Sequence, residues 1–237
     1  AGFGEERGQM FFRIMDILQV KHPRYVLLEN VKNLYRHDNG NTYARIQQEL
    51  EGLGYHVFPN IFNTVDFHLP QKRSRVLIFA TTEIVPVDFA AHYTPDNVKA
   101  LFDEHYQQLS VQNYNTTLDL LEEHVDARYF LSDRLKPTIL ADGSANFKSR
   151  SDINQLIART LTASMHKMHR AGVDNYVTHK GRIRKLTPRE CLRLMGFKDS
   201  FKIAVSDTAI YQQAGNSIVV DVLIALLKQL DITKYGI

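Results

Sequence analysis

The sequence predicts an α/β protein with a smaller mixed region, and two observations support this. Over residues 1–82, segments whose apolar residues recur at helical spacing alternate with short, continuous apolar runs. Such runs are typical of buried strands, and their alternation with helices indicates an α/β fold. Residues 83–185 are more polar and less periodic, and a strong helix start opens residues 186–237. We therefore expect three parts with these boundaries.

In the first part, the sequence predicts two helices and three strands. Apolar residues from Met10 to Leu18 recur at helical spacing, and Pro23 cannot continue that helix. A continuous apolar run predicts a strand that is buried on both faces. The elements expected next are a buried strand at Tyr25–Leu28, a helix at Thr42–Leu53, a strand at Tyr55–Val65 and a buried strand at Val76–Ala80. We expect an antiparallel pair at the end of this part.

Helix signals continue through the rest of the chain. Thr187 can cap a helix, Pro188 suits its first position and Glu190 completes a capping box. Gly196 fits the stop of the same helix. Further helices are predicted at Pro95–Leu109, Asn115–Glu123 and Val219–Leu230.

Composition limits the class of protein. The 237 residues are 44% hydrophobic, which is enough for one large or two modest domains. The net charge of +3 permits nucleic acid as a partner without arguing for it. A single cysteine, Cys191, excludes an internal disulfide and a cysteine-based metal site, and it fits a reducing, cytosolic setting. No apolar run approaches the length that spans a membrane, and the start of the chain does not resemble a signal peptide.

Three short segments carry candidate chemistry. Glu29 follows a predicted strand, where open α/β sheets place their ligands, although it could equally start a surface loop. Gln71, Arg73 and Arg75 alternate before the next buried strand. In an extended chain their side chains would aim at one spot and suit an anionic or hydrogen-bond-accepting ligand; the alternative is a solvated basic rim. Gly215-Asn216-Ser217 precedes the last helix and offers free backbone N–H groups, or is an ordinary helix boundary.

Taken together and in order, these motifs resemble the later motifs of the cytosine-C5 DNA methyltransferases. The resemblance covers residues 1–82 and 184–237. It implies the later part of a Rossmann-like sheet that uses S-adenosylmethionine (AdoMet), with residues 83–185 as a smaller mixed target-recognition domain. The motifs are Arg7-Gly8, Glu29-Asn30-Val31, the segment Arg36–Thr42, Gln71-x-Arg73-x-Arg75, the segment Leu186–Phe197 and Gly215-Asn216-Ser217.

The resemblance implies methyl transfer from AdoMet to C5 of a flipped cytosine in duplex DNA, through a covalent cysteine adduct. Glu29 would bind N3 and the exocyclic amine of cytosine, and binding N3 favours a neutral carboxyl group. Arg73 and Arg75 would stabilise charge on the ring. The residues expected beside AdoMet are Met10, Asn216 and Ser217.

The same resemblance implies DNA contacts. Those expected are made by Arg7, Gln71, Arg150, Thr160 and Lys167, with Gln71 acting mainly in positioning. Within the loop Lys148–Asn154 and just after it, the side chains suited to base edges are Arg150, Asp152, Asn154 and Gln155. Lys167, Arg170 and Lys180 suit phosphates, although any surface of this composition offers such residues. No metal is expected.

Parts of the family pattern are missing. Cys191 lies on an apolar helix face and is expected to be a buried structural residue, so we expect the catalytic cysteine and most of the AdoMet site outside this chain. An N-terminal segment or subunit would supply them and cover the open sheet edge, and the chain alone would be inactive. The alternatives are a non-catalytic, sequence-specific DNA-binding module and a relative that methylates transfer RNA. The expected setting is the bacterial cytoplasm, associated with the nucleoid.

Overall fold

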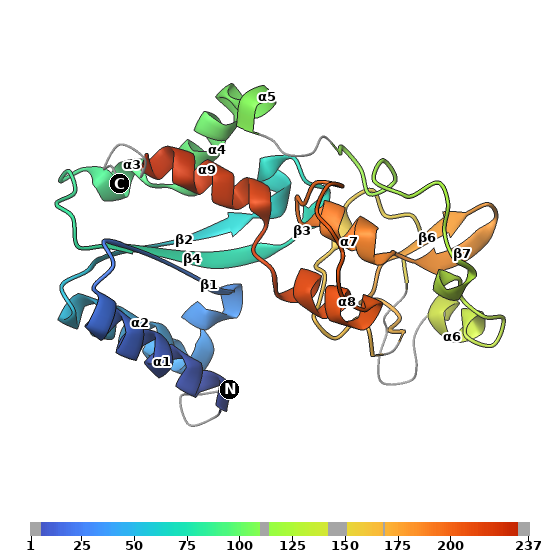
Figure 1. The fold of residues 1–237 in the computed structure, drawn as a ribbon, viewed down its shortest axis with the longest axis horizontal. Helices are drawn as coiled ribbons and strands as arrows, with labels where there is room; N and C mark the ends of the chain where they lie inside the picture. The colour runs from blue at the N-terminus through green and yellow to red at the C-terminus, as the bar shows by residue number, and fades with distance from the viewer. Residues whose placement is uncertain (1–5, 110–113, 142–150, 168, 232–237) are drawn as a thin grey trace. The chain divides into compact units, whose positions relative to one another are not determined.

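The computed structural model describes residues 6–109, 114–141, 151–167 and 169–231 (Figure 1). The chain divides into two compact units, which we describe separately. The first consists of Ala1–Phe62 and Ser74–Ala100, and the second of Asn63–Arg73 and Leu101–Ile237. These units divide the chain at other places than the three predicted parts, so the functional assignment of those parts stays a prediction.

A three-stranded sheet with strand order β1-β4-β2 organises the first unit. β1 (Tyr25–Val31) pairs antiparallel with β4 (Ser74–Thr81), and β2 (His56–Asn63) is the other neighbour of β4. Helices α1 (Glu6–Lys21) and α2 (Asn41–Gly52) bury Leu18 and Leu50 against Val76 and Ile78 of β4. The predicted helices and strands of this region are thus confirmed, with small shifts at their ends.

The opposite face of this sheet carries an aromatic cluster. The Phe79 ring on β4 stacks with Tyr25 and Phe58 at centroid distances of 6.3 Å. Phe89, on the short helix α3 (Phe89–His92), contacts Phe58 edge to face at 4.6 Å. Residues on both faces of β4 are therefore buried, because alternate side chains of a strand enter opposite layers.

β1 differs from its prediction in length, burial and pairing. It continues through Glu29 to Val31, so Glu29 lies within the strand and not after it. Among its seven residues only Val26 is buried. Within the part of the chain that the structure describes, β1 is the edge of its sheet and pairs antiparallel with β4, so the expected burial of both its faces is not observed there.

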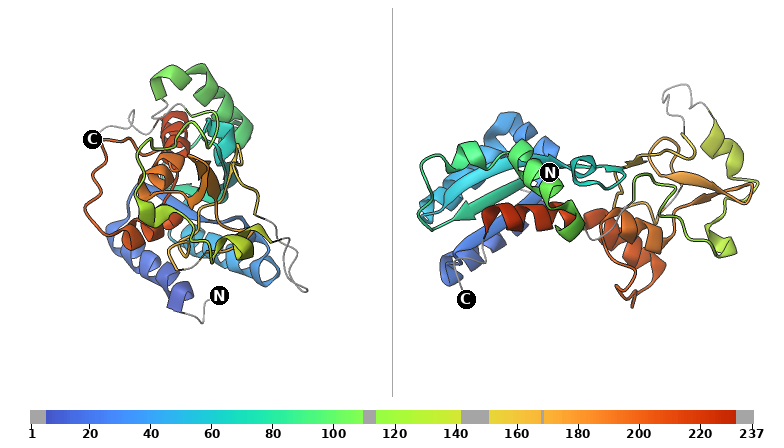
Figure 2. Two further views of the ribbon diagram at one scale, coloured as in Figure 1. Left: turned by 90° about the vertical axis from the view of Figure 1, so that its right-hand side faces the viewer. Right: turned by 90° about the horizontal axis from the view of Figure 1, so that it is seen from above.

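The second unit is built from short strands and helices. β3 (Gln71–Lys72) pairs parallel with β5 (Ala158–Arg159), and β6 (Tyr176–His179) forms an antiparallel hairpin with β7 (Arg182–Lys185). The helices α7 and α8 pack together (Figure 2). The remaining elements are α4 (Pro95–Glu104, which crosses the boundary between the units), α5 (Tyr106–Leu109), α6 (Lys136–Leu140), α7 (Pro188–Leu194), α8 (Asp207–Asn216), α9 (Val220–Leu230), and the 3-10 turns η1 (Lys32–Tyr35), η2 (His37–Gly40), η3 (Thr64–Phe67) and η4 (Ala127–Tyr129).

Helix α7 starts as predicted. The Thr187 side chain accepts from Glu190 N, and the Glu190 side chain accepts from Thr187 N, which completes the capping box. Glu190 also forms a bidentate ion pair with Arg184, with distances of 2.7 and 2.8 Å and both side chains fully buried. Gly196 ends the region with φ of 82°. The carboxylate therefore joins β7 to the first turn of α7.

One expected helix is absent from the structure, and one expected helix boundary has another origin. Residues 115–123 form turns, because their backbone groups pair with distant residues: Thr117 N donates to Leu156 O at 2.7 Å and Glu122 N donates to Glu190 Oε1 at 2.8 Å. Gly215 and Asn216 end α8, a helix that the sequence did not suggest, so the segment is an ordinary helix boundary, the second of the two alternatives. By length and composition, the apolar stretch 207–230 could span a membrane. Half of its most apolar window is buried inside the protein, and the stretch is broken at Ser217 between α8 and α9. It is therefore weak evidence for a membrane span.

Candidate active site

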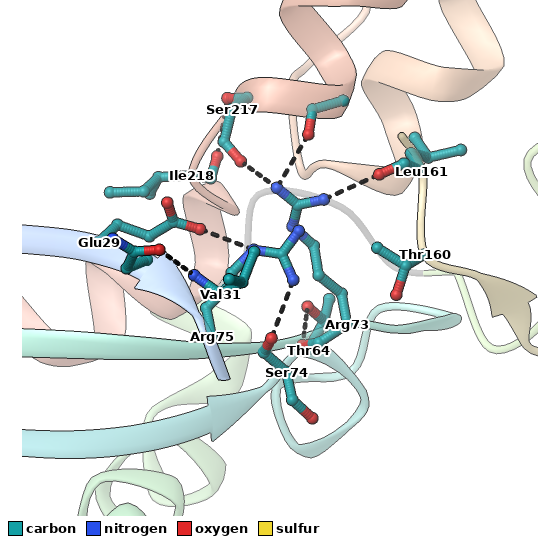
Figure 3. A network of polar contacts seen from close by, with 12 residues as sticks. Glu29, Val31, Thr64, Arg73, Ser74, Arg75, Thr160, Leu161, Ser217 and Ile218 are labelled. Carbon is teal, nitrogen blue, oxygen red and sulfur yellow. Dashed lines mark hydrogen bonds and ion pairs between the residues drawn. The ribbon is translucent and has the colours of Figure 1, made fainter. Parts of the chain in front are cut away.

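Glu29 and Arg75 form an ion pair in the first unit. Glu29 Oε1 lies 2.8 Å from Arg75 Nε, and the side chains are 21% and 19% exposed. The register places Val31 opposite Arg75, so Glu29 and Arg75 lie on one face of neighbouring strands (Figure 3). Arg75 Nη1 also donates to Ser74 O at 2.9 Å. A partly exposed carboxylate beside a fixed guanidinium offers hydrogen-bond acceptors and donors in one place.

Two effects act on the pKa of Arg75 in opposite directions. Burial lowers the pKa of Arg75, and the nearby Glu29 carboxylate counteracts that shift. A guanidinium stays charged through the physiological range, and an adjacent cation favours the ionised carboxylate. The prediction that Glu29 holds a proton for cytosine N3 stays a prediction.

Gln71 and Arg73 are buried in the second unit. Gln71 is 0% exposed; its Nε2 donates to Leu194 O at 2.9 Å and its Oε1 accepts from Leu161 N at 2.9 Å. Gln71 holds backbone groups in this structure, in line with the positioning role expected of it, and its expected contact with DNA stays a prediction. Arg73 is 2% exposed and donates to Leu161 O at 3.0 Å.

The predicted convergence of these three side chains holds for two of them. Gln71 and Arg73 both reach the backbone of Leu161, whereas Arg75 pairs with Glu29. The extended run is interrupted at Arg73, because β3 ends at Lys72 and β4 begins at Ser74. The observed acceptors of Gln71 and Arg73 lie within the protein: they are backbone carbonyls and, for Gln71, also Met195 Sδ at 3.4 Å. Alternation along the sequence cannot indicate such partners.

The residues expected beside AdoMet are open to a ligand to different degrees. Met10 on α1 is 62% exposed, and Asn216 is exposed at the end of α8. Ser217 is half-buried, and its hydroxyl donates to Ile218 O at 2.9 Å. Contact of these residues with AdoMet stays a prediction, and the amine, carboxylate and ribose hydroxyls of AdoMet need further partners.

The expected DNA contacts divide three ways. Lys167 and Lys180 are exposed and available to phosphates. Others are engaged within the protein: Thr160 Oγ1 donates to Lys72 O at 2.6 Å, and Arg170 pairs with Asp174 at 2.8 Å. The predicted base readers pair likewise, as Asp152 with Arg159, Gln155 with Asp152 and Asn154 with Thr178. Arg150 and the side chain of Arg7 lie outside what the structure describes.

Cys191 is a structural residue, as predicted. It is 1% exposed on α7, and burial raises the pKa of its thiol well above the ordinary value. A protonated, buried thiol is a poor nucleophile. Among the residues that the structure describes, no group of three or more histidine, cysteine, aspartate or glutamate side chains could hold a metal ion.

Comparison with known proteins identifies the family. The family model described as C-5 cytosine-specific DNA methylase matches residues 1–231. The chain belongs to the C-5 cytosine-specific DNA methylase family. Members of this family use AdoMet as the methyl donor, so the expected cofactor agrees with the family.

Named DNA methylases are similar over nearly the whole chain. The type II methyltransferase M.NgoBI of Neisseria gonorrhoeae is 38% identical over 231 residues, which are 96% of this chain and 67% of the relative. M.SsoII of Shigella sonnei is 37% identical, over 97% of this chain and 58% of the relative. The chain thus spans about two thirds or less of the length of these relatives.

Solved structures agree on the fold. The Dnmt2 methyltransferase of S. pombe matches 97% of this chain and 75% of its own, with a TM-score of 0.72 and 22% identity. A putative DNA modification methyltransferase encoded within an E. coli prophage matches 99% of this chain and 77% of its own, with a TM-score of 0.60 and 17% identity. At these identities the likeness concerns the methylase fold alone.

Proposed function

We propose that this chain is the later part of a bacterial DNA cytosine-C5 methyltransferase that modifies a flipped cytosine in duplex DNA. The Glu29–Arg75 pair is the observation that carries the proposal, since it joins a carboxylate and a guanidinium with part of each still exposed. The family membership of the chain and its similarity to type II methyltransferases support a role in restriction–modification, in the cytoplasm beside the nucleoid.

The roles of the two side chains follow from their chemistry. Glu29 would hold N3 and the exocyclic amine of cytosine, with one proton shared between its carboxylate and N3. Arg75 would donate to the cytosine O2 and stabilise negative charge on the ring while a thiolate adds to C6. C5 then takes the methyl group that AdoMet supplies, the C5 proton is removed, and the thiolate leaves as the C5–C6 double bond reforms.

We further propose that an N-terminal segment or subunit completes the enzyme and brings the nucleophile. Cys191 is buried and does not meet that need. In the described part of the first unit, β1 is an edge strand. Nearby, α1 leaves Met10, Ile17 and Val20 between 59% and 75% exposed. An open strand edge and exposed apolar side chains are features that a partner segment would cover.

One assay tests these proposals together. Labelled methyl transfer from AdoMet to duplex DNA is measured for the chain and for its Cys191→Ala variant, each alone and with the N-terminal complement. We expect transfer only with the complement, and equal transfer by Cys191→Ala. Transfer by the chain alone that is lost in Cys191→Ala would contradict the assignment of the nucleophile.

Two other functions are outcomes of the same assay. Specific DNA binding without transfer, with a complement shown to bind, would identify a DNA-binding module, for which the buried Cys191 is the supporting observation. If transfer RNA and DNA compete in the assay and transfer RNA is methylated in preference, the chain is a relative that methylates RNA.

A further inference from the structure

Arg73 lies at a buried junction that joins segments far apart in the sequence. Its Nη1 donates to Leu161 O at 3.0 Å, and its Nη2 donates to Gly215 O at 3.2 Å and to Ser217 O at 2.9 Å (Figure 3). We call Arg73, the loop Thr160–Ala163 and the segment Gly215–Ser217 the Arg73 junction. All of its residues belong to the second unit.

The loop side of the junction is fixed by β3. Leu161 N donates to Gln71 Oε1 at 2.9 Å, and Thr160 Oγ1 donates to Lys72 O at 2.6 Å. Gln71 and Arg73 thus hold the two backbone groups of Leu161, one its N–H and the other its carbonyl oxygen. The loop therefore has little freedom to move relative to Arg73.

The other side of the junction is in direct backbone contact with the loop. A Cβ atom on Gly215 would lie 2.2 Å from Ala163 N and 2.3 Å from Thr162 C. Only glycine allows this approach. Arg73 therefore holds together two backbones that already touch, and a small displacement of either one changes the position of Asn216.

The chemistry of an arginine suits this place. Gly215 is in the last turn of α8, where carbonyl groups lack helical partners and carry partial negative charge. A planar guanidinium can donate to several carbonyls at once from a fixed geometry, and a buried cation is stabilised by such acceptors. A neutral side chain of similar length would leave these carbonyls without a donor.

We propose that Arg73 is a positioning residue for methyl transfer and does not contact the cytosine. This rests on the proposed function and on the expectation from the family resemblance that Asn216 and Ser217 lie beside the methyl donor and that the loop carrying Thr160 approaches DNA. Arg73 fixes the segment Gly215–Ser217 to the loop Thr160–Ala163. It thereby fixes the position of the segment expected beside AdoMet relative to the loop expected near DNA. Loss of Arg73 is therefore expected to weaken binding of the donor.

Hydrogen exchange on the chain itself tests the positioning without any activity. In Arg73→Met, amides of Leu161 and residues 214–218 should exchange at least about tenfold faster, because a hydrogen bond to a charged donor is lost. Arg73→Lys keeps a buried cation and should restore most of the protection. Arg189→Met is the matched control, since Arg189 also donates to backbone carbonyls, at Phe201 O and Lys198 O, and it should leave the junction unchanged.

Kinetics of the completed enzyme separate positioning from contact with the base. We expect Arg73→Met to raise KM for AdoMet by about tenfold or more, and Arg73→Lys to recover most of that loss. A fall in kcat with unchanged KM for AdoMet and unchanged exchange would overturn the proposal and make Arg73 a catalytic residue. If the wild-type enzyme transfers no methyl group, the proposed function fails. The exchange experiment still tests the junction in that case: faster amide exchange in Arg73→Met supports its role there, and unchanged exchange contradicts it.

Discussion

Glu29 lies within β1 with 21% of its side chain exposed, and its carboxylate is 2.8 Å from Arg75 Nε. The same ion pair therefore anchors the carboxylate and leaves it open to a ligand. Arg73 and Gln71, from the same motif, are instead committed to backbone groups. Neighbouring residues of one motif thus have different tasks, which depend on what each side chain meets in space.

Replacing Glu29 by glutamine keeps the shape of the side chain and removes its charge and its ability to share a proton with N3. We expect single-turnover methyl transfer by the completed enzyme to fall by about 10²- to 10⁴-fold, with DNA affinity in fluorescence anisotropy retained. Glu49→Gln is the control, because Glu49 pairs with Arg45 on α2 within the same unit. Unchanged turnover in Glu29→Gln would remove the proposed role.

The lowered pKa of His169 leads us to expect that the stability of the fold depends on pH. Burial, and then the charge of Lys185, lowers the pKa of His169 below its ordinary value of 6.5, with Asp174 opposing the shift. The unfolded chain therefore takes up the proton first, so stability present above about pH 6.5 is lost as the pH falls. The urea midpoint should decrease between about pH 7.5 and about pH 5.5, and less so in His169→Gln. An identical pH dependence in this variant would show that His169 is not responsible.

Short elements of the second unit are held by contacts between distant segments. α7 starts with its own capping box, which contiguous residues provide. α8, in contrast, ends against the loop Thr160–Ala163, where Gly215 touches backbone and Arg73 supplies donors to its last carbonyls. The end of α8 is therefore sensitive to residues that lie far away in the sequence.

Gly215→Ala tests the contact at the end of α8. The new methyl group would meet Ala163 N at 2.2 Å, and backbone cannot move aside as a flexible side chain can. We expect a loss of at least about 2 kcal/mol in the free energy of unfolding from urea titration. Gly52→Ala, which has no atom within 4 Å of its new Cβ, is the control and should be neutral or slightly stabilising. Equal stability of both variants would contradict the close packing.

For the whole molecule, the open edge of β1 is the feature with the largest consequence. In the chain alone, backbone amides of β1 that do not face β4 should exchange rapidly, because no strand of the described chain pairs with that edge. Addition of the N-terminal complement should slow exchange at alternate residues of β1 and on α1. Exchange that is unaffected by a complement shown to bind would mean that it docks elsewhere.

Much of the local structure could be predicted from the sequence. α1, α2, α7 and α9 follow from apolar spacing and capping residues, and β4 from its apolar run. The helix expected at residues 115–123 failed because Thr117 and Glu122 donate to Leu156 and Glu190 instead of to their own segment. Propensity acts between neighbours in the sequence, and a distant acceptor can outcompete it.

The sequence by itself determined the family, the burial of Cys191 and the choice of Glu29, Arg73 and Arg75 as candidate residues. Motif order, apolar spacing and residue type can all be read along the chain. Only the tertiary structure decided that Arg75 meets Glu29, that Arg73 meets Leu161, Gly215 and Ser217, and that β1 is an edge. The acceptors of Arg73 lie 88 and 142–144 residues away, and contacts over such separations form only when the chain has folded.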